Sequence, residues 1–394
     1  MDLNGLKGEY VMKKLKIMLC GSDGYIGHPL VLRLLKKGHT VIGIDNGSRR
    51  DNVKDYGSIS ATHIPTLYNR HNAYHSIGNF IFIKCDIALE PSKINRLIDK
   101  HKPDVLVNLA HNPSAPASMQ HQPAANEILT NNIIGTNNVL WGIHQFSPET
   151  HYITIGSTGE YNHTLDVDIE EGYFTFEHKG RTTKECLFPR EANSLYHASK
   201  ISSTYIIDYL TKLWDLKCTD VMQSVVYGLY TEECERYKSP TRLDSDDMYG
   251  TVFNRFLMQA LIGEPLTVYG EGKHQRAFLA LNDSIQALEL AIYSTPEKGK
   301  VQTWNQLSEM HSIEDVVGII KKVLPNLTTV HIDSPRGEFT GEHYYNIISD
   351  KLKDLGYEPT RTMEDEVRYI MDTIKLNVKL VGELQKVVKP RTIF

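Results

Sequence analysis

A glycine-rich turn between an apolar run and a helical pattern is the feature that most constrains the fold. Residues 15–20 (LKIMLC) are too short an apolar run for a helix of their own and predict a buried strand. The turn GSDGYIG follows at 21–27, and residues 30–35 have helical spacing. Glycines let the backbone turn tightly and approach a pyrophosphate, and a helix start offers free N–H groups. The stretch therefore predicts a dinucleotide site in a parallel α/β sheet.

The second predicted strand, residues 40–44, favours NAD as the dinucleotide. Asp45 follows it directly, where the ribose hydroxyls of the adenosine should lie. A carboxylate at this place would repel a 2′-phosphate, so NAD is preferred over NADP. Arg49 and Arg50 weaken that preference slightly, because an arginine can receive such a phosphate.

Strands alternating with helices along the chain predict a doubly wound parallel (Rossmann) sheet. Further strands are expected at 79–85, 104–109, 151–156 and 218–226, and long helices at 124–146 and 195–216. We assign residues 15–228, with later returning segments, to the NAD-binding domain. Residues 229–394 are mainly a smaller, discontinuous substrate-binding lobe, and residues 1–14 a flexible extension. In the lobe we expect a flexible excursion at 232–247, helices at 251–262 and 282–293, and a strand at 266–269.

Ligands bind at the carboxyl edge of open parallel sheets, so residues that follow the strands are the predicted cofactor contacts. They are Gly21, Asp23, Gly24, Tyr25, Ile26, Gly27, Asp45, Asn46, Arg49, Arg50, Asp86, Ile87, Leu109, Ala110, His111, Tyr196, Lys200 and Val226.

Tyr196 and Lys200 lie four residues apart, on one face of the predicted helix 195–216. A phenol has an unperturbed pKa of about 10, too high for a base at neutral pH, and a nearby ammonium lowers it. Ser157, at the end of the predicted strand 151–156, offers a hydroxyl that can hold a substrate alcohol beside the phenolate. These groups are suited to removing a proton from an alcohol while hydride leaves its carbon.

Composition argues against several other classes of protein. The chain has 394 residues with 43 basic and 48 acidic side chains, a formal charge of -5. A mildly acidic chain without a long basic run is a poor nucleic-acid binder. No stretch approaches the ~20 apolar residues of a membrane span, and no secretory signal is evident. Five cysteines without a CxxC pair favour a reducing compartment, so we expect a cytoplasmic protein.

Three histidines invite a metal hypothesis. His63, His71 and His75 lie in a long insertion at 49–79, but their spacing matches no ligand pattern and no cysteine or paired carboxylate accompanies them. A polar surface loop that could fold over the cofactor is expected instead of a metal site.

Several sequence blocks resemble the UDP-sulfoquinovose synthases, a family of extended short-chain dehydrogenases/reductases that act on nucleotide sugars. The glycine turn, Ser157, Tyr196 and Lys200 carry the resemblance to the wider superfamily. The more specific blocks are GEY (159–161), DIEEGY (168–173), GRT (180–182), VVYG (225–228), PLTVYG (265–270), NQ (305–306) and EHYYN (342–346). The resemblance spans residues 15–390. It implies conversion of UDP-glucose and sulfite to UDP-sulfoquinovose through 4-keto and 4-keto-5,6-ene intermediates, with NAD recycled in the active site.

The resemblance also implies roles for individual residues. Tyr196 would be the base for the C4 hydroxyl, Lys200 its electrostatic partner and a ribose contact, and Ser157 the holder of that hydroxyl. His197 is our choice for the proton transfers at C5 or C6, since imidazole titrates near neutrality. Arginines suit the diphosphate of the substrate, because a guanidinium matches phosphate oxygens. The predicted substrate contacts are Ser157, Arg181, Gln223, Arg255, Thr267, Val268, Tyr269, Arg276, Arg336 and His343.

Two positions depart from related enzymes. Nucleotide-sugar 4,6-dehydratases have an Asp-Glu pair directly after the hydroxyl residue, whereas this chain has Thr158 and Gly159. Pro113 stands where plant-type synthases have an arginine, so any sulfite-binding role of that arginine is absent or moved, with Arg181 as the substitute we suggest.

Two other functions stay open. One is another UDP-sugar 4-epimerase or 4,6-dehydratase, which would turn over without sulfite. The other is a catalytically inactive, NAD-sensing regulator. A homodimer or homotetramer paired through helices 124–146 and 195–216 is expected, and the sequence does not show whether a partner protein delivers the sulfite.

Overall fold

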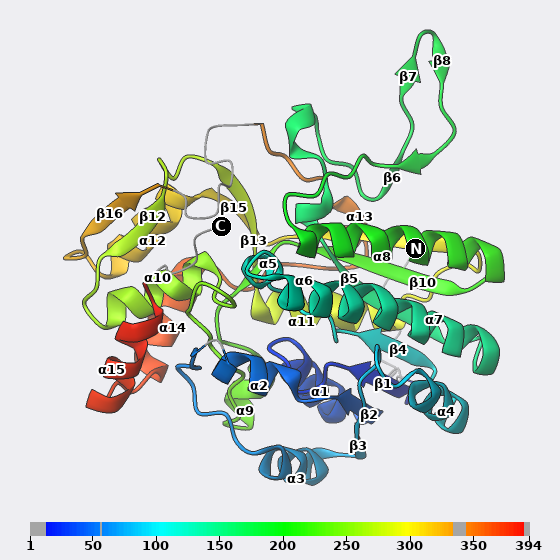
Figure 1. Cartoon of the computed structure of the whole chain (residues 1–394), viewed down its shortest axis with the longest axis horizontal. Coiled ribbons are helices and arrows are strands. Elements are labelled where there is room, and N and C mark those ends of the chain that lie inside the picture. Colours follow the sequence, from blue (N-terminus) through cyan, green and yellow to red (C-terminus); the bar gives the residue numbers. More distant parts are fainter. Residues whose placement is uncertain (1–12, 56, 334–343, 390–394) are drawn as a thin grey trace, which may run out of the picture.

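The centre of the molecule is a parallel sheet, as the doubly wound prediction requires (Figure 1). The computed structural model describes residues 13–55, 57–333 and 344–389, so the predicted extension at 1–14 lies outside this range apart from its last two residues. Seven strands pair in the order β3 (Phe80–Lys84), β2 (Thr40–Asp45), β1 (Lys16–Cys20), β4 (Val105–Asn108), β5 (His151–Ser157), β10 (Lys217–Gln223) and β14 (Lys300–Gln306). The strand order reverses between β1 and β4, which is where such sheets bind ligands.

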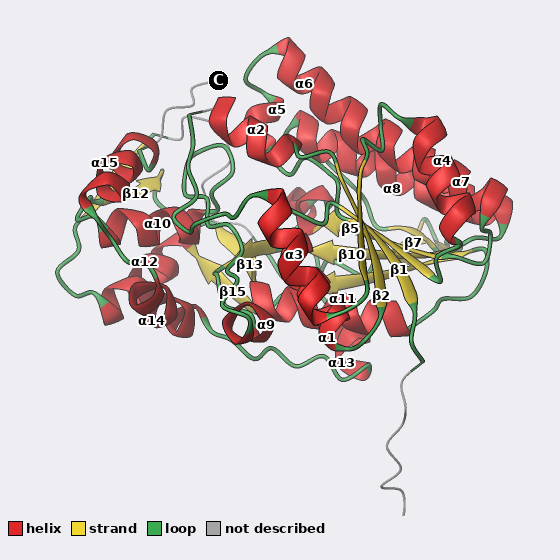
Figure 2. Cartoon of the chain, turned by 90° about the horizontal axis from the view of Figure 1, so that it is seen from below, coloured by secondary structure: helices red, strands yellow, loops and turns green. Residues whose placement is uncertain are grey.

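Helices cover both faces of this sheet (Figure 2). Alternate residues of β1 point to opposite sides: Ile17 and Leu19 join one buried cluster, and Met18 and Cys20 join another. The first face is covered by α1 (Gly27–Lys36) and α11 (Leu281–Tyr293), with α3 (Leu67–Ile77) and α13 (Asp350–Asp354) at its edges; the second is covered by α4 (Pro91–His101), α7 (Gly135–Phe146) and α8 (Leu195–Trp214).

The predicted helix 124–146 is interrupted. It consists of α6 (Gln122–Leu129), a π-helical turn (Thr130–Ile134) and α7, with the short α5 (Ala115–Ser118) before it. The turn brings the buried Asn132 amide within reach of two partners: its Oδ1 accepts from Asn112 N–H at 2.8 Å, and its Nδ2 donates to Ser199 Oγ at 2.9 Å. A π turn inside a helix is frequently found at a functional site, and here it fixes the loop after β4 against α8.

The predicted strand 218–226 is two strands in two sheets. β10 ends at Gln223, and β11 (Val225–Tyr227) pairs with β13 (Gln275–Ala280), which pairs in turn with β15 (Glu309–Ser312). The seventh strand, β14, was not anticipated as a strand and is one of the returning segments of the central sheet.

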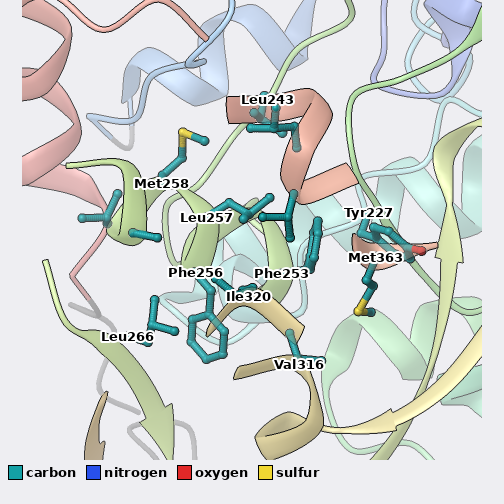
Figure 3. Packing of buried hydrophobic residues seen from close by; sticks show 14 of the residues in the cluster. Tyr227, Leu243, Phe253, Phe256, Leu257, Met258, Leu266, Val316, Ile320 and Met363 are labelled. Atoms are coloured by element: carbon teal, nitrogen blue, oxygen red, sulfur yellow. The ribbon is translucent and has the colours of Figure 1, made fainter. Parts of the chain in front are cut away.

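The smaller lobe has a hydrophobic core of its own (Figure 3). Phe253, Phe256 and Leu257 of α10 (Val252–Leu261) pack against Val316 and Ile320 of α12 (Ile313–Val323). The lobe elements are α10, β12 (Leu266–Tyr269), α12, β16 (Thr329–Ile332), α14 (Met363–Thr373) and α15 (Val378–Val387), whereas α9 (Glu232–Arg236) packs on α1 with Cys234 in the core of the central sheet.

The insertion at 49–79 is mainly helical, so the expected loop is wrong. It holds α2 (Ser48–Asp55) and α3, because Tyr74 has an apolar core to enter beside Phe80. The His71 ring packs against the Phe82 ring at an angle of 32°, with the ring centroids 3.9 Å apart. In the part of the chain that the structure describes, no group of histidine, cysteine or carboxylate side chains is arranged to hold a metal ion.

The flexible excursion expected at 232–247 is also wrong, because residues 241–247 are buried. The charges in this segment are neutralised in place: Arg242 Nε donates to Asp244 at 2.7 Å, and Asp244 also receives Arg49 Nη2 at 2.6 Å. Ser58 donates a hydrogen bond to Asp246. The segment thus joins α2 to the lobe.

A two-stranded hairpin projects from the body of the molecule (Figure 1). It consists of β7 (Glu177–His178) and β8 (Arg181–Thr182), carried on β6 (Tyr173–Phe174) and β9 (Cys186–Leu187). None of the helices within the described ranges is long and apolar enough to cross a membrane.

Candidate active site

A cavity of about 920 Å³ runs along the carboxyl edge of the central sheet and under the lobe. Of the predicted cofactor contacts, all but Asp23 and Arg50 line it. The predicted substrate contacts Ser157, Gln223 and Arg276 line it too. The cavity therefore unites the turn after β1, the ends of β2 to β5 and the start of α8.

The glycine turn is packed so closely against neighbouring backbone that only glycine fits at two of its positions. Gly21 has φ +84°, and a Cβ there would lie 2.6 Å from the Leu109 carbonyl oxygen. A Cβ on Gly27 would lie 2.0 Å from the Gly21 oxygen. Side chains at these two positions would close the approach to the N terminus of α1, so the turn fits the pyrophosphate of a dinucleotide.

Asp45 ends β2 at the wall of the cavity. Its Oδ2 accepts the Asp23 N–H at 2.9 Å, and its Oδ1 accepts the Gly47 N–H at 2.8 Å. Burial raises the pKa of this carboxyl, while the two N–H groups oppose the shift. Each oxygen keeps a lone pair, so Asp45 can also accept hydrogen bonds from a ribose diol.

The three predicted catalytic groups converge. Ser194 caps α8 and begins the helix that carries Tyr196 and Lys200, and the Ser157 side chain lies close enough to the Tyr196 phenol to lower the pKa of that phenol. The Lys200 ammonium lies 5.9 Å from the centroid of the Tyr196 ring. This is the geometry of a proton-abstracting site in which the serine and the tyrosine meet a substrate oxygen together.

The pKa values differ from the simple expectation. Burial, followed by the charge of Glu160, raises the pKa of the Tyr196 phenol, and the nearby Ser157 side chain opposes that shift. Burial lowers the pKa of Lys200 to about 8, with Glu160 and Asp220 opposing. In the protein alone, Lys200 therefore does not bring the phenol into the working range.

Lys200 is held by two acceptors. Its Nζ donates to the Ile155 carbonyl oxygen at 2.7 Å and contacts His111 Nδ1 at 2.7 Å. His111 Nε2 contacts the Thr136 hydroxyl at 2.9 Å, and that hydroxyl donates to the Asn132 carbonyl oxygen. Burial and the charge of Lys200 hold the pKa of His111 well below its usual range, so the ring is a neutral acceptor for the ammonium.

His197 lines the cavity beside the tyrosine. Its Nδ1 lies 2.8 Å from Ser194 Oγ, and a Cβ on Gly159 would lie 2.5 Å from its Nε2. Burial, then the charges of Arg276 and Lys200, lowers the pKa of His197 to about 4. The expected titration near neutrality is not found, and the ring is a neutral base at pH 7.

A buried carboxylate pair behind β5 was missed by the sequence reasoning. Glu160 Oε1 accepts the Ser157 N–H at 2.7 Å, and its Oε2 accepts from Thr204 at 2.9 Å and from Arg190 at 3.2 Å. Asp220 also reaches the Thr204 hydroxyl, at 3.4 Å. Burial, then the charge of Glu160, raises the pKa of Asp220, while Arg190 and Lys200 oppose the shift.

Two signals could have found this pair. Ser157-Thr158-Gly159-Glu160 reads as a capping box, and the structure forms that box. Asp220 is a charged residue inside an otherwise buried strand, which requires compensation in the fold.

The side of the cavity where the substrate is predicted to bind agrees less well with the expected contacts. Arg255 donates to the Tyr269 hydroxyl at 2.6 Å and to the Thr267 carbonyl oxygen at 3.1 Å, and Val268 is part of the lobe core. None of these four residues lines the cavity. Arg181 lies on the exposed hairpin and does not reach it either. Arg336 and His343 lie outside the described residues.

Other residues line this side of the cavity without having been predicted. The Tyr345 and His163 rings are in contact, with centroids 4.9 Å apart. The unpredicted lining residues here include Thr158, Gly159, His163, Asn193, Asp247, Met248, Tyr249 and Tyr345. They come from segments far apart in the sequence, so no local spacing announces them.

Comparison with known proteins agrees with this site. Residues 17–305 match the NAD dependent epimerase/dehydratase family. The chain belongs to that family. NAD is accordingly its cofactor, and the cavity residues named above fit it.

Two relatives within the family narrow the comparison. The chain is 37% identical over 350 residues to a chloroplastic UDP-sulfoquinovose synthase of Spinacia oleracea, covering 87% of this chain and 72% of the relative. It is 34% identical over 383 residues to a UDP-sulfoquinovose synthase of Sulfolobus acidocaldarius, covering 96% and 97%. The resemblance drawn from the sequence blocks is thereby confirmed.

A solved structure shows the same fold. A mutant of the UDP-glucuronic acid 4-epimerase of Bacillus cereus, in complex with UDP-4-deoxy-4-fluoro-glucuronic acid and NAD, superposes with a TM-score of 0.67. That comparison is 22% identical and covers 91% of this chain and 99% of the epimerase.

Proposed function

We propose that this chain forms UDP-sulfoquinovose from UDP-glucose and sulfite, with NAD reduced and reoxidised at the same site. The observation that carries the proposal is the identity with two UDP-sulfoquinovose synthases over most of the chain. The cavity supports the proposal, because Ser157, Tyr196 and Lys200 all line it. The two residues after Ser157 are Thr158 and Gly159, so the Asp-Glu pair of the dehydratases is missing.

The first proton transfer falls to Tyr196. Ser157 holds the C4 hydroxyl of glucose, and Tyr196, as the phenolate, removes its proton. Bound NAD supplies the hydride acceptor for C4, the donor for the closing reduction and, when oxidised, a positive charge that favours the phenolate. Lys200, positioned by Ile155 and His111, adds a second positive charge.

The 4-ketone acidifies the C5 hydrogen, so elimination becomes feasible. Neutral His197 takes the C5 proton and delivers it to the C6 hydroxyl, which leaves as water to give the 4-keto-5,6-ene. The sulfur of sulfite then bonds to C6 while C5 regains a proton, and the reduction at C4 takes its proton from Tyr196. Because the proton regained at C5 comes from solvent, the overall change is UDP-glucose, sulfite and one proton to UDP-sulfoquinovose and water.

The test is to incubate purified protein and NAD with UDP-glucose, with and without sulfite, and to analyse the sugar by mass spectrometry. We expect a sulfonated product only when sulfite is present. A 4-keto sugar or UDP-galactose formed without sulfite would instead identify a dehydratase or an epimerase. No change of the sugar under either condition would favour the inactive regulator.

The chain is also proposed to form a homodimer through α7 and α8. These helices expose Trp141, Tyr205, Tyr209 and Leu213, and Tyr209 is 63% exposed. Such a patch on two adjacent helices is costly to leave in water. Tyr209→Glu should lower the molar mass measured by light scattering, while Tyr68→Glu, on exposed α3, should leave it unchanged.

A further inference from the structure

Asp23, inside the glycine turn, faces away from the cavity and holds two arginines of the insertion. Arg50 grips it with two nitrogens, Nε to Oδ2 at 2.5 Å and Nη2 to Oδ1 at 2.9 Å. Arg70 donates from Nη1 to Oδ1 at 2.6 Å. The side chains of Asp23 and Arg70 are 5% and 2% exposed, so the cluster is almost closed to water.

Arg50 is engaged on every nitrogen. Its Nη1 donates to the Pro65 carbonyl oxygen at 2.8 Å, in addition to the two bonds to Asp23. It does not line the cavity, although it lies only five residues beyond Asp45. The side chain that could receive a 2′-phosphate is therefore turned toward the back of the glycine turn.

The neighbouring Arg49 is held as well. Its Nη2 pairs with Asp244 at 2.6 Å, and its guanidinium carbon lies 3.4 Å from the centroid of the Tyr249 ring. Arg49 lines the cavity all the same, and its Nη1 has no hydrogen-bond partner among the described residues, whereas Arg50 does not line the cavity.

The charges of the Asp23 cluster are balanced without a ligand. The carboxylates of Asp23 and Asp45 are joined through the Asp23 N–H and face the guanidinium groups of Arg50 and Arg70. Burial by itself would raise the pKa of Asp23, but Arg50 and Arg70 outweigh burial and hold this pKa below its usual range. If Arg50 turned toward a phosphate, the buried Asp23 carboxylate would lose the guanidinium that donates to both of its oxygens, which is strongly unfavourable.

We propose that Asp23 strengthens the preference of the chain for NAD over NADP by holding Arg50 away from the adenosine ribose, so that Arg50 cannot neutralise a 2′-phosphate that Asp45 repels. Two features thus disfavour NADP: the Asp45 carboxylate repels its 2′-phosphate, and the Arg50 guanidinium is held where it cannot reach that phosphate. This inference concerns the cofactor alone and does not depend on the sugar chemistry.

Binding of NAD and of NADP, measured by titration calorimetry, tests the inference in three proteins: wild type, Asp45→Asn, and Asp45→Asn with Ser48→Arg. Asp45→Asn removes the charge while keeping an oxygen for the Asp23 N–H. Ser48 is the first residue of α2 and lines the cavity, so an arginine there offers a guanidinium that Asp23 does not hold. We expect the single variant to bind NADP only slightly better than wild type, and the double variant to gain at least about tenfold more. If Asp45→Asn alone gains as much as the double variant and loses that gain when Arg50→Gln is added, Arg50 is free to turn and the inference is wrong.

Releasing Arg50 directly gives the converse test. Asp23→Asn in the Asp45→Asn background should raise NADP affinity by about tenfold, and adding Arg50→Gln should abolish that gain. A gain that survives Arg50→Gln would overturn the inference. Thermal unfolding and ADP binding report whether each variant is folded, and if Asp23→Asn does not fold, the effect of Arg50→Gln on the Asp45→Asn variant still decides.

Discussion

The two halves of the cavity are built in different ways. The half that holds the nucleotide is assembled from residues that directly follow β1, β2, β3 and β4, so one rule about strand ends locates nearly all of them. The sugar half draws on the turn after β5, the segment at 247–251, β13 and the chain near Tyr345. A local motif can specify the first half, whereas only the complete tertiary fold specifies the second.

The sharpest test of this contrast lies at the junction of the halves. Tyr196→Phe removes the phenol that we propose as the proton-abstracting group, so turnover should fall by about 10²–10⁴-fold. NAD affinity, measured by calorimetry, should stay within about twofold because the residues at the strand ends are untouched. Retention of more than a tenth of the turnover would show that another group is the base.

His197→Asn should separate two steps on the sugar side. If the imidazole serves the elimination, overall turnover should fall by about 10²-fold, while reduction of NAD on mixing with UDP-glucose remains. Exchange of the C5 hydrogen with deuterated water, followed by mass spectrometry, measures the step directly. Unchanged exchange would remove His197 from the mechanism.

A matched pair of arginines compares a residue in the cavity with one outside it. Arg276→Ala should raise the KM for UDP-glucose by about tenfold, because the predicted charged contact to the diphosphate would be lost. Arg181→Ala, on the exposed hairpin, should leave turnover and both KM values within about twofold. An effect of Arg181 on the KM for sulfite would mean that the hairpin reaches the active site.

The smallest expected effect concerns pH. Because the pKa of Lys200 is lowered to about 8, its ammonium is lost as pH rises through that value, and kcat/KM should fall there. Ionised Asp220 opposes this loss, so Asp220→Asn should move the alkaline limb to lower pH while leaving the maximum nearly unchanged. Glu160 and Arg190 stay in place as the other charges around Asp220. An alkaline limb that does not move would show that Asp220 is not coupled to Lys200.

Much of the framework could be predicted because the signals are local. The glycine turn, Asp45 and the spacing of Tyr196 and Lys200 each lie within a few residues, and the structure places them around one cavity. The paired positions of Glu160 and Asp220 could not be predicted together, since they are brought into contact by strands and a helix that are far apart in the sequence.

The errors have physical causes of the same kind. Residues 241–247 read as a charged, mobile excursion because their partners Arg49 and Ser58 lie in a segment some two hundred residues earlier. Arg255 read as a phosphate ligand, but Tyr269 and the Thr267 carbonyl oxygen of the same lobe satisfy it. A guanidinium gives no sign in the sequence of whether a protein group or a ligand will receive it.

The buried segment at 241–247 has a consequence for how this molecule can be taken apart. Asp244 pairs with Arg49 of α2, and Asp246 accepts a hydrogen bond from Ser58 in the loop after α2. A cut at residue 228 would separate these partners, so each fragment would contain groups that are buried in the intact protein but have lost their partner. Neither fragment should fold by itself, and the two should regain a cooperative melting transition only when mixed. The two halves of the cavity should therefore unfold together, even though they are formed largely by successive parts of the chain.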